Sequence, residues 1–410
     1  MYLTLSKRFE ISTSVSLARG DRTDAENRHW YGPASASRLG HGYNYVLYVV
    51  FHGEVDPATG MMINVSTVKE RVNKLLGARY DHKYLNVDTA PFDRIAPTPE
   101  NIARQLSDEI RPLFLGERAC PVAVHVAATP DDAATVYGDG RVERHLFVEF
   151  SAARRTNSPH LSDAENDALF GRAASKAGHG HNYRLRVTLS GSVDDDWGAI
   201  APFERTDSAM RSLRELLDHR NLNDEVRALH GKPITTESLA RFVLEQVKQT
   251  LPVSRVRLWE LPHFSVEYVS GARFMMTLEK SFHAAHRLHS KALDETQNHE
   301  LYGKCNNPAG HGHQYRVEAS LVGPYDERTG TMCNLLEFDN GFEQALAPWR
   351  YKHLDQEVAD FAERPSTGEN IVDALWPRVD VAMPGNLQRL RLWETPNNRF
   401  TLRRALWSVA

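Results

Sequence analysis

Apolar and polar residues alternate with a period of two over residues 145–152, and again over 254–262 and 263–270, which predicts strands with one buried face. Between them, residues 207–219 and 235–251 read as two amphipathic helices, the second opened by Thr235 and Glu237 as a helix start should be. A further alternating strand at "HGHNYRLRVTLS" follows a loop after the first. The expected order is ββααββ, an α+β unit with helices on one face of an antiparallel sheet.

The same pattern occurs three times along the chain. "LGHGYNYVLYVVFHGEVD" (39–56), "AGHGHNYRLRVTLSGSVD" (177–194) and "AGHGHQYRVEASLVGPYD" (309–326) align without a gap. Downstream, "YDHKYLN", "LDHRNLN" and "WRYKHLD" keep nearly the same offset from these phrases, and a Glu follows later in "TPEN", "TTES" and "TGEN". We therefore expect three repeats, at residues 1–138, 139–271 and 272–410.

Repetition also predicts how the units assemble. A four-stranded sheet has two free edges, and three linked copies could pair edge to edge and close a barrel with the helices outside. The predicted fold is three tandem ββααββ units forming a pseudo-trimeric antiparallel β-barrel.

The third repeat carries a candidate metal site. His311 and His313 are two apart on a predicted strand and so share a face, and His286 lies on the opening strand of the same repeat. Three neutral imidazoles with no fourth protein ligand describe an open, catalytic type of zinc site. The alternative is a set of packed or hydrogen-bonded histidines, which fits a single His better than three beside the lone Cys305.

The other two repeats lack parts of this set. The second keeps His179 and His181 but has Arg154 at the third position, and the first has His41, Tyr43 and Val15. Cys305 is likewise replaced by Ser35 and Ala173. The sequence predicts one metal site per chain.

Composition narrows the function classes. The 410 residues are 41% hydrophobic and 25% charged, with a formal net charge of −4. That balance offers no excess of basic residues for nucleic acid or an anionic membrane surface. Three cysteines cannot form a disulfide framework, and no apolar run is long enough to span a membrane, so we expect a cytoplasmic protein.

At "SFHAAHRL", "CNNPAGHGHQY", "TGEN" and "LRLWETPNN", the third repeat resembles the 6-pyruvoyltetrahydropterin and 6-carboxytetrahydropterin synthase family of the tunnelling fold. Members are single units that form a trimeric barrel and then two stacked trimers. The resemblance implies one trimer-like ring in a single chain, and a homodimer that would reproduce the hexamer.

The resemblance also implies residue roles. His286, His311 and His313 would bind Zn²⁺, and Cys305 would remove a proton from 7,8-dihydroneopterin triphosphate. Glu369 would grip the pterin ring, and Glu394 would lie near the zinc and the reacting side chain.

An Asp-His pair that relays the proton completes the family's site, and here the third repeat departs from the pattern. It has Arg350 and Tyr351, whereas Asp81 and His82 are present in the first repeat and Asp218 and His219 in the second. We expect one composite site in which a neighbouring repeat supplies the pair, with Asp218 and His219 slightly favoured.

Three readings stay open at this stage. A lyase could form either the pyruvoyl product or the carboxy product of deazapurine-pathway relatives. A pterin-binding or scaffold protein could keep the zinc but have lost turnover. Zinc-dependent hydrolysis is the third, and it leaves Cys305 and Glu369 without a role.

Overall fold

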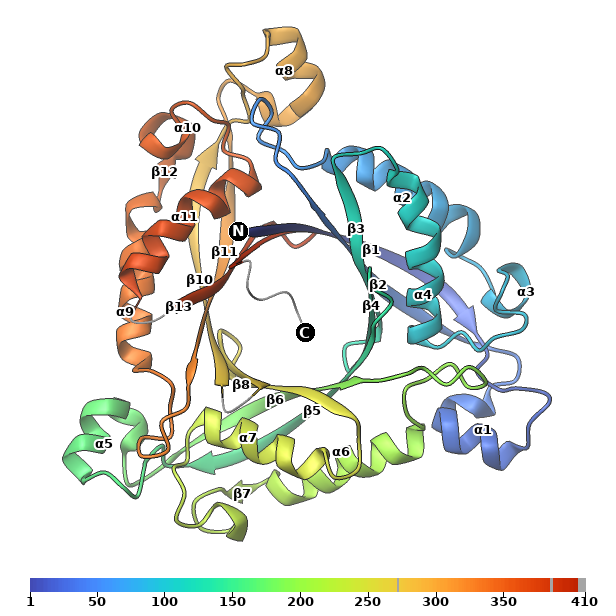
Figure 1. Ribbon diagram of the computed structural model, residues 1–410, viewed down its shortest axis with the longest axis vertical. Helices are drawn as coiled ribbons and strands as arrows, with labels where there is room; N and C mark the ends of the chain where they lie inside the picture. The colour runs from blue at the N-terminus through green and yellow to red at the C-terminus, as the bar shows by residue number, and fades with distance from the viewer. Residues whose placement is uncertain (271–272, 384–385, 405–410) are drawn as a thin grey trace.

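The computed structural model describes residues 1–270, 273–383 and 386–404 and folds them into one closed ring of three similar repeats (Figure 1). The first repeat contains β1 (Tyr2–Val15), α1 (Asp24–Tyr31), β2 (His41–Gly53), α2 (Val65–Arg79), α3 (Leu85–Asp88), α4 (Pro99–Ile110), β3 (Ala119–Thr129) and β4 (Asp132–Tyr137). The second contains β5 (Val142–Arg154), α5 (Asp163–Phe170), β6 (His179–Ser190), α6 (Phe203–Leu217), β7 (Arg220–Asn221), α7 (Thr236–Val247), β8 (Val253–Leu261) and β9 (Phe264–Ser270).

The third repeat contains β10 (Arg273–His286), α8 (Glu295–Tyr302), β11 (His311–Pro324), α9 (Leu335–Leu346), β12 (Lys352–His353), α10 (Leu354–Glu357), α11 (Gly368–Ala382), β13 (Asn386–Thr395) and β14 (Asn398–Arg403). Short 3-10 helices are η1 (Gly32–Ala36), η2 (Arg111–Phe114), η3 (Gly171–Ala174), η4 (Arg227–Leu229), η5 (Gly303–Asn306), η6 (Ala347–Trp349) and η7 (Ala359–Phe361).

Twelve long strands of the described chain close the barrel in the order β11-β13-β14-β1-β2-β3-β4-β5-β6-β8-β9-β10, and β10 pairs with β11 to complete it. All of these pairings are antiparallel. The repeats join at three seams, β14 with β1, β4 with β5, and β9 with β10. The predicted α+β barrel of three units is confirmed.

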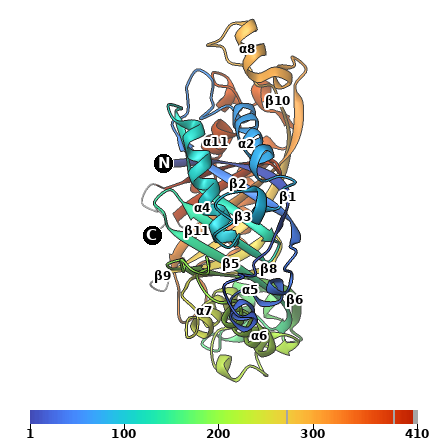
Figure 2. The same ribbon diagram turned by 90° about the vertical axis from the view of Figure 1, so that its right-hand side faces the viewer.

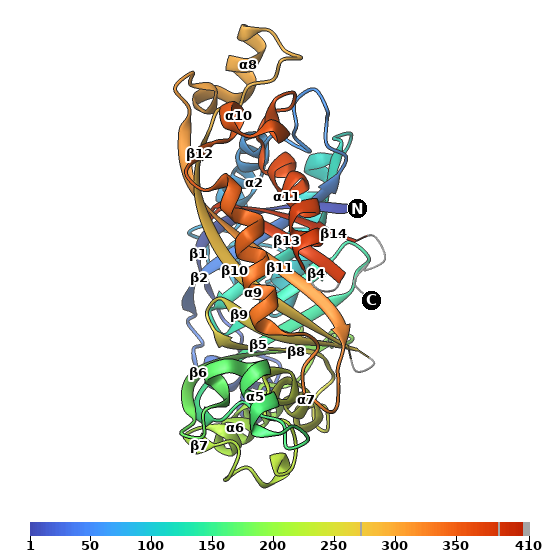
Figure 3. The same ribbon diagram turned by 90° about the vertical axis from the view of Figure 1, so that its left-hand side faces the viewer.

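The helices cover the outside of this barrel. In Figure 2, α2 and α4 lie over the strands of the first repeat, and in Figure 3, α9 and α11 lie over those of the third. Residues such as Leu185, Val187 and Leu258 on one strand face join a single buried apolar cluster with helix residues such as Leu217 and Val243. Burial of this face against the helices is what holds each repeat together.

Alternate residues of the same strands point the other way and line the barrel with charge. Arg186 lies 3.0 Å from Glu267, and Arg391 lies 3.0 Å from Glu318. The strands therefore turn their apolar face outward to the helices and their charged face into the barrel, unlike a barrel whose interior is filled with apolar side chains.

A short helix joins the first two strands of each repeat, where the sequence suggested only a loop. Each helix (α1, α5, α8) begins with a capping box, formed by Thr23 with Glu26, Ser162 with Glu165, and Asp294 with Gln297. The signal was present in the sequence, because Ser-x-x-Glu is a recognised helix start. In the described part of the chain no helix is both long enough and apolar enough to cross a membrane.

Candidate active site

Three histidines meet where β10 ends and β11 begins. Antiparallel pairing sets His286 opposite His311 and Ala284 opposite His313, so all three imidazoles project from one face. His286 Nε2 lies 3.1 Å from His311 Nε2, and one ring nitrogen from each histidine lies within 4.8 Å of the others. The parity of the strands, readable in the sequence, brings the trio together.

The electrostatics of the trio suit a metal ion. His286 Nδ1 donates to the Ser366 carbonyl at 3.0 Å, which leaves the lone pair of Nε2 free to coordinate. Burial lowers the pKa of His286 to about 3 and that of His313 to about 4, so both rings are neutral ligands at pH 7. His313 Nε2 is buried with no hydrogen-bond partner among the described residues. This donor set fits a dication such as Zn²⁺.

Glu394 and Cys305 flank the histidines. Glu394 Oε1, on β13, lies 3.5 Å from His286 Nε2 and 3.7 Å from His313 Nε2. Burial raises the pKa of Glu394 to about 6. Cys305 lies in η5, and its carbonyl accepts from the Leu288 amide at 2.9 Å, which ties it to the chain just after His286. Burial raises the pKa of the thiol, and the charge of Glu394 raises it further.

Glu369 lies at the seam between the third and first repeats. It sits in the first turn of α11, whose N-cap Thr367 donates to the Gly60 carbonyl at 2.6 Å. The Met62 amide of the first repeat donates to Glu369 Oε1 at 3.0 Å. The carboxyl is buried, and burial raises its pKa to about 7. The first repeat therefore forms one wall of the site.

The family model for 6-pyruvoyl tetrahydropterin synthase matches residues 4–139, 145–270 and 275–405. The chain belongs to this family.

Individual relatives align with about one repeat. Two curated proteins named 6-pyruvoyl tetrahydrobiopterin synthase, from Poecilia reticulata and Homo sapiens, are each 42% identical, over 125 and 120 residues. These alignments cover 30% and 29% of this chain and 85% and 83% of the relatives. The solved 6-pyruvoyl tetrahydropterin synthase from Caenorhabditis elegans is 33% identical, with a TM-score of 0.32, over 32% of this chain and 96% of its own. The relatives support a pterin synthase function.

The Asp-His pairs lie apart from Cys305. Asp81 Oδ1 accepts from the Ser12 amide at 2.8 Å, and Asp218 Oδ1 accepts from Ser151 at the same distance, so each pair is tied to the opening strand of its own repeat. In Figure 1, α3 just after His82 and β7 just after His219 lie at other sides of the ring than α8, which leads into η5.

Our expectation that a neighbouring repeat brings an Asp-His pair to Cys305 within one chain is thus not met. The sequence does not reveal which part of the neighbouring repeat reaches the site. In the structure, the first repeat contributes the loop from Gly60 to Met62, and not its Asp-His turn. The histidines are instead presented to solvent, with side chains 82% and 81% exposed.

All three turns share an unusual backbone. His82, His219 and Tyr351 have positive φ angles of 57°, 56° and 59°. Tyr351 takes the place of the His in the third repeat and is 81% exposed. Figure 3 shows β7 and β12, which follow His219 and Tyr351, at the barrel end away from the N-terminus. The zinc-type trio lies at this same end, because β12 pairs with β10 at Ala284 and Ala285.

One residue beside the trio escaped the sequence reasoning. A Cβ built at Gly310 would lie 2.6 Å from His353 Nε2, so the His353 ring packs against the backbone that leads into His311. Both of its ring nitrogens are buried without a hydrogen-bond partner among the described residues. The phrase "WRYKHLD" contained the signal, but its His is displaced by two positions from the family's Asp-His pair.

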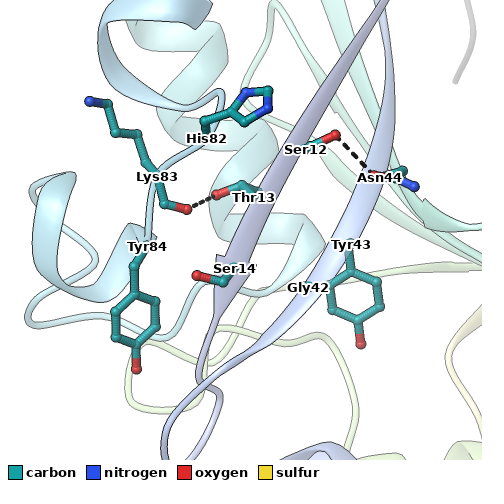
Figure 4. A pocket seen from close by; sticks show the side chains of 9 residues that line it. All are labelled: Ser12, Thr13, Ser14, Gly42, Tyr43, Asn44, His82, Lys83 and Tyr84. Carbon is teal, nitrogen blue, oxygen red and sulfur yellow. Dashed lines mark hydrogen bonds between the residues drawn. The ribbon is translucent and has the colours of Figure 1, made fainter.

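The corresponding positions in the first and second repeats differ from the site of the third repeat, each in its own way. In the first repeat, His41 Nε2 contacts the Tyr43 hydroxyl at 3.2 Å. The nearby strand surface forms an open hollow of about 460 Å³, lined by residues that include Ser12, Asn44 and His82 (Figure 4).

In the second repeat, His179, His181 and Glu260 converge as a trio, but Arg154 fills the place of the missing imidazole. Its guanidinium pairs with Glu260, a buried ion pair that supplies a positive charge where the third repeat would hold a metal. Glu260 corresponds to Glu394, since each follows a Trp in the same strand of its repeat, a signal that the sequence analysis missed.

Proposed function

We propose that the chain is a zinc-dependent synthase that acts on 7,8-dihydroneopterin triphosphate with loss of triphosphate. The observation that supports this best is the convergence of His286, His311 and His313 beside Cys305 and Glu394. A Zn²⁺ ion held by the three rings would act as a Lewis acid toward the hydroxyls of the substrate side chain.

The chain's own residues would divide the remaining work. Glu369, held by the Met62 amide, would accept hydrogen bonds from the N–H and amino groups of the pterin edge and so orient the ring. Cys305 would take the carbon-bound proton as the general base. Glu394, with its pKa near 6, would exchange a proton with the reacting side chain close to the histidines.

The Asp-His pairs would enter the site from a second copy of the chain. The histidine of each pair is exposed, and β7, which follows His219, lies at the barrel end that also carries the trio. A homodimer stacked through this end, as the family resemblance implies, would turn the pairs of one chain toward Cys305 of the other. In the dimer we assign the proton relay to Asp81 and His82 or to Asp218 and His219.

The product would be 6-pyruvoyltetrahydropterin or 6-carboxytetrahydropterin. The names of the similar relatives favour the pyruvoyl compound. The five residues between Cys305 and His311 favour it as well, through the resemblance.

A second candidate is a pterin-binding protein that keeps the metal site without turnover. It is favoured by Arg350 and Tyr351 in the third repeat. It is also favoured by the places of α3 and β7, which follow the Asp-His pairs and lie at other sides of the ring than α8 (Figure 1).

Metal content and triphosphate release, measured on the wild type and on Cys305→Ala, would separate the two. If the chain is a synthase, both proteins should bind zinc, the wild type should release triphosphate, and Cys305→Ala should release none. Zinc without release in the wild type would support the binding protein. Mass analysis of the product would assign the pyruvoyl or carboxy branch.

A further inference from the structure

The seam between the second and third repeats contains a cavity of about 90 Å³. Three charged side chains of the second repeat line it, namely Arg154, Glu237 and Glu260. The remaining wall is largely apolar and comes from both repeats, including Phe170, Phe264, Met276, Leu335 and Leu336. A mainly apolar cavity with a few convergent polar groups is the usual form of a small-molecule site.

Glu237 is held in this cavity as Glu369 is held in the zinc site. It lies in the first turn of α7, is 2% exposed, and its Oε1 accepts from the Met332 amide of the next repeat at 3.2 Å. Thr331 also donates to Oε1. Two neighbouring donors therefore orient the carboxylate toward the seam.

The corresponding seam between the first and second repeats is closed by an internal ion pair. There Glu100 Oε1 accepts from the Ile200 amide at 3.3 Å, but Oε2 pairs with Arg144. No such cation is bonded to Glu237 among the described residues. The carboxylate of Glu237, between the second and third repeats, is thus still available as an acceptor, whereas that of Glu100, between the first and second, is used by Arg144.

Arg154 supplies the opposite charge. It is 3% exposed, and its Nη2 binds Thr236 at 3.1 Å and pairs with Glu260. Its Nε and Nη1 are buried and have no hydrogen-bond partner among the described residues. A buried guanidinium with unsatisfied N–H groups is a strong donor for a carboxylate or other oxyanion.

We propose that this seam is a second, metal-free binding site for a planar nitrogen heterocycle that carries an acidic substituent. Adjacent N–H and amino groups, as in a 2-amino-4-oxopteridine or a guanine, would donate to Glu237, and the acidic group would bind Arg154. The ring would lie between the apolar side chains. The inference rests on the proposed function only for the analogy between Glu237 and Glu369.

The size of the cavity is compatible with this ligand. One water needs roughly 10–15 Å³ of such volume, so the cavity holds on the order of six to nine waters. A bicyclic ring takes a similar space, whereas a substrate with a triphosphate chain would not fit. A site of this kind would bind a product or a related acid without turning it over.

Titration of the zinc-loaded full chain with pterin-6-carboxylate tests the proposal. In Glu369→Gln, which disables the grip at the zinc site, we expect one equivalent to bind. The further change Glu237→Gln should abolish this binding, because the amide keeps the bonds from Met332 and Thr331 but presents fewer acceptors to the ligand. Glu369→Gln with Glu100→Gln is the matched control and should still bind one equivalent.

Arg154→Gln gives an independent readout of the charge contact. It should weaken pterin-6-carboxylate roughly tenfold or more while changing unsubstituted pterin little. Circular dichroism would confirm that each variant is folded, and Arg154→Lys, which keeps the charge, should restore part of the affinity.

The proposal is wrong if Glu369→Gln binds no probe, or if the equivalent that it binds survives Glu237→Gln. Equal weakening of pterin and pterin-6-carboxylate by Arg154→Gln would also overturn it. Failure of the proposed function is separate, because absent triphosphate release by the wild type would leave these binding ratios measurable.

Discussion

Replacing Glu369 with Gln should make the folded protein more stable above pH 7. Burial raises the pKa of this carboxyl to about 7, from an ordinary value of 4.5. Between these two values the folded protein holds a proton that the unfolded chain releases, so stability falls as the pH rises through this window and stays lower above it. Gln keeps the acceptor for the Met62 amide and carries no charge to bury.

The magnitude follows from the shift. At about 1.4 kcal/mol per pKa unit, a rise from 4.5 to about 7 costs the ionised wild type roughly 3 kcal/mol above pH 7. With an unfolding entropy of about 2 cal/mol/K per residue, a chain of 410 residues would gain roughly 3–4 °C in melting temperature. The same substitution should abolish turnover, since the pterin loses its acceptor.

Thermal melts of metal-stripped wild type and Glu369→Gln between pH 5 and pH 8 provide the assay. The difference in melting temperature should be small at pH 5 and largest at pH 8, and contributions from the histidines cancel between the two proteins. Glu100→Gln is the control, because it leaves Arg144 without one of its partners and should destabilise the protein at pH 8. A difference for Glu369→Gln that is equal at pH 5 and pH 8 would refute the reasoning.

Three other substitutions test the geometry of the sites. Gly310→Ala should cost at least about 1–2 kcal/mol of stability, because Gly310 has a positive φ. It should also weaken metal binding, because the new Cβ would displace the His353 ring beside the three histidines. Gly140→Ala, at a positive φ with open space around it, is the control for backbone strain alone. Arg154→His should raise the zinc content measured by atomic absorption from one ion to two per chain, and an unchanged content would contradict the view that the guanidinium stands in for a metal. Cys305→Ala mixed with a chain lacking the two exposed relay histidines should recover turnover in heterodimers, and no recovery would exclude a site shared between chains.

Much of the fold could be read from the sequence. The period of two in the strands and the three aligned phrases gave the order of elements, and counting free sheet edges gave the closed barrel. His286, His311 and His313 could be grouped because strand parity is local and their pairing register is short. Such features depend on neighbours along one hairpin.

The parts that escaped prediction depend on contacts between repeats or on charge. Which turn abuts Cys305 is decided by how the seams close, so the positions of His82 and His219 could not be deduced. Arg154 could be seen as a lost ligand, but its pairing with Glu260 needed the neighbouring strand β8 in place. His353 was missed because alignment to the Asp-His position drew attention to Tyr351 instead.

The seam between β14 and β1 has a consequence for how the chain is made. Tyr2 pairs with Arg403, so β1 leaves the ribosome long before β14, the strand that covers its outer edge. Contacts of such sequence separation form slowly, and an open strand edge can pair with other chains in the meantime. Synthesis of this protein therefore passes through a long period with an unprotected sheet edge, when chaperones would matter most and when a truncated chain would be most prone to aggregate.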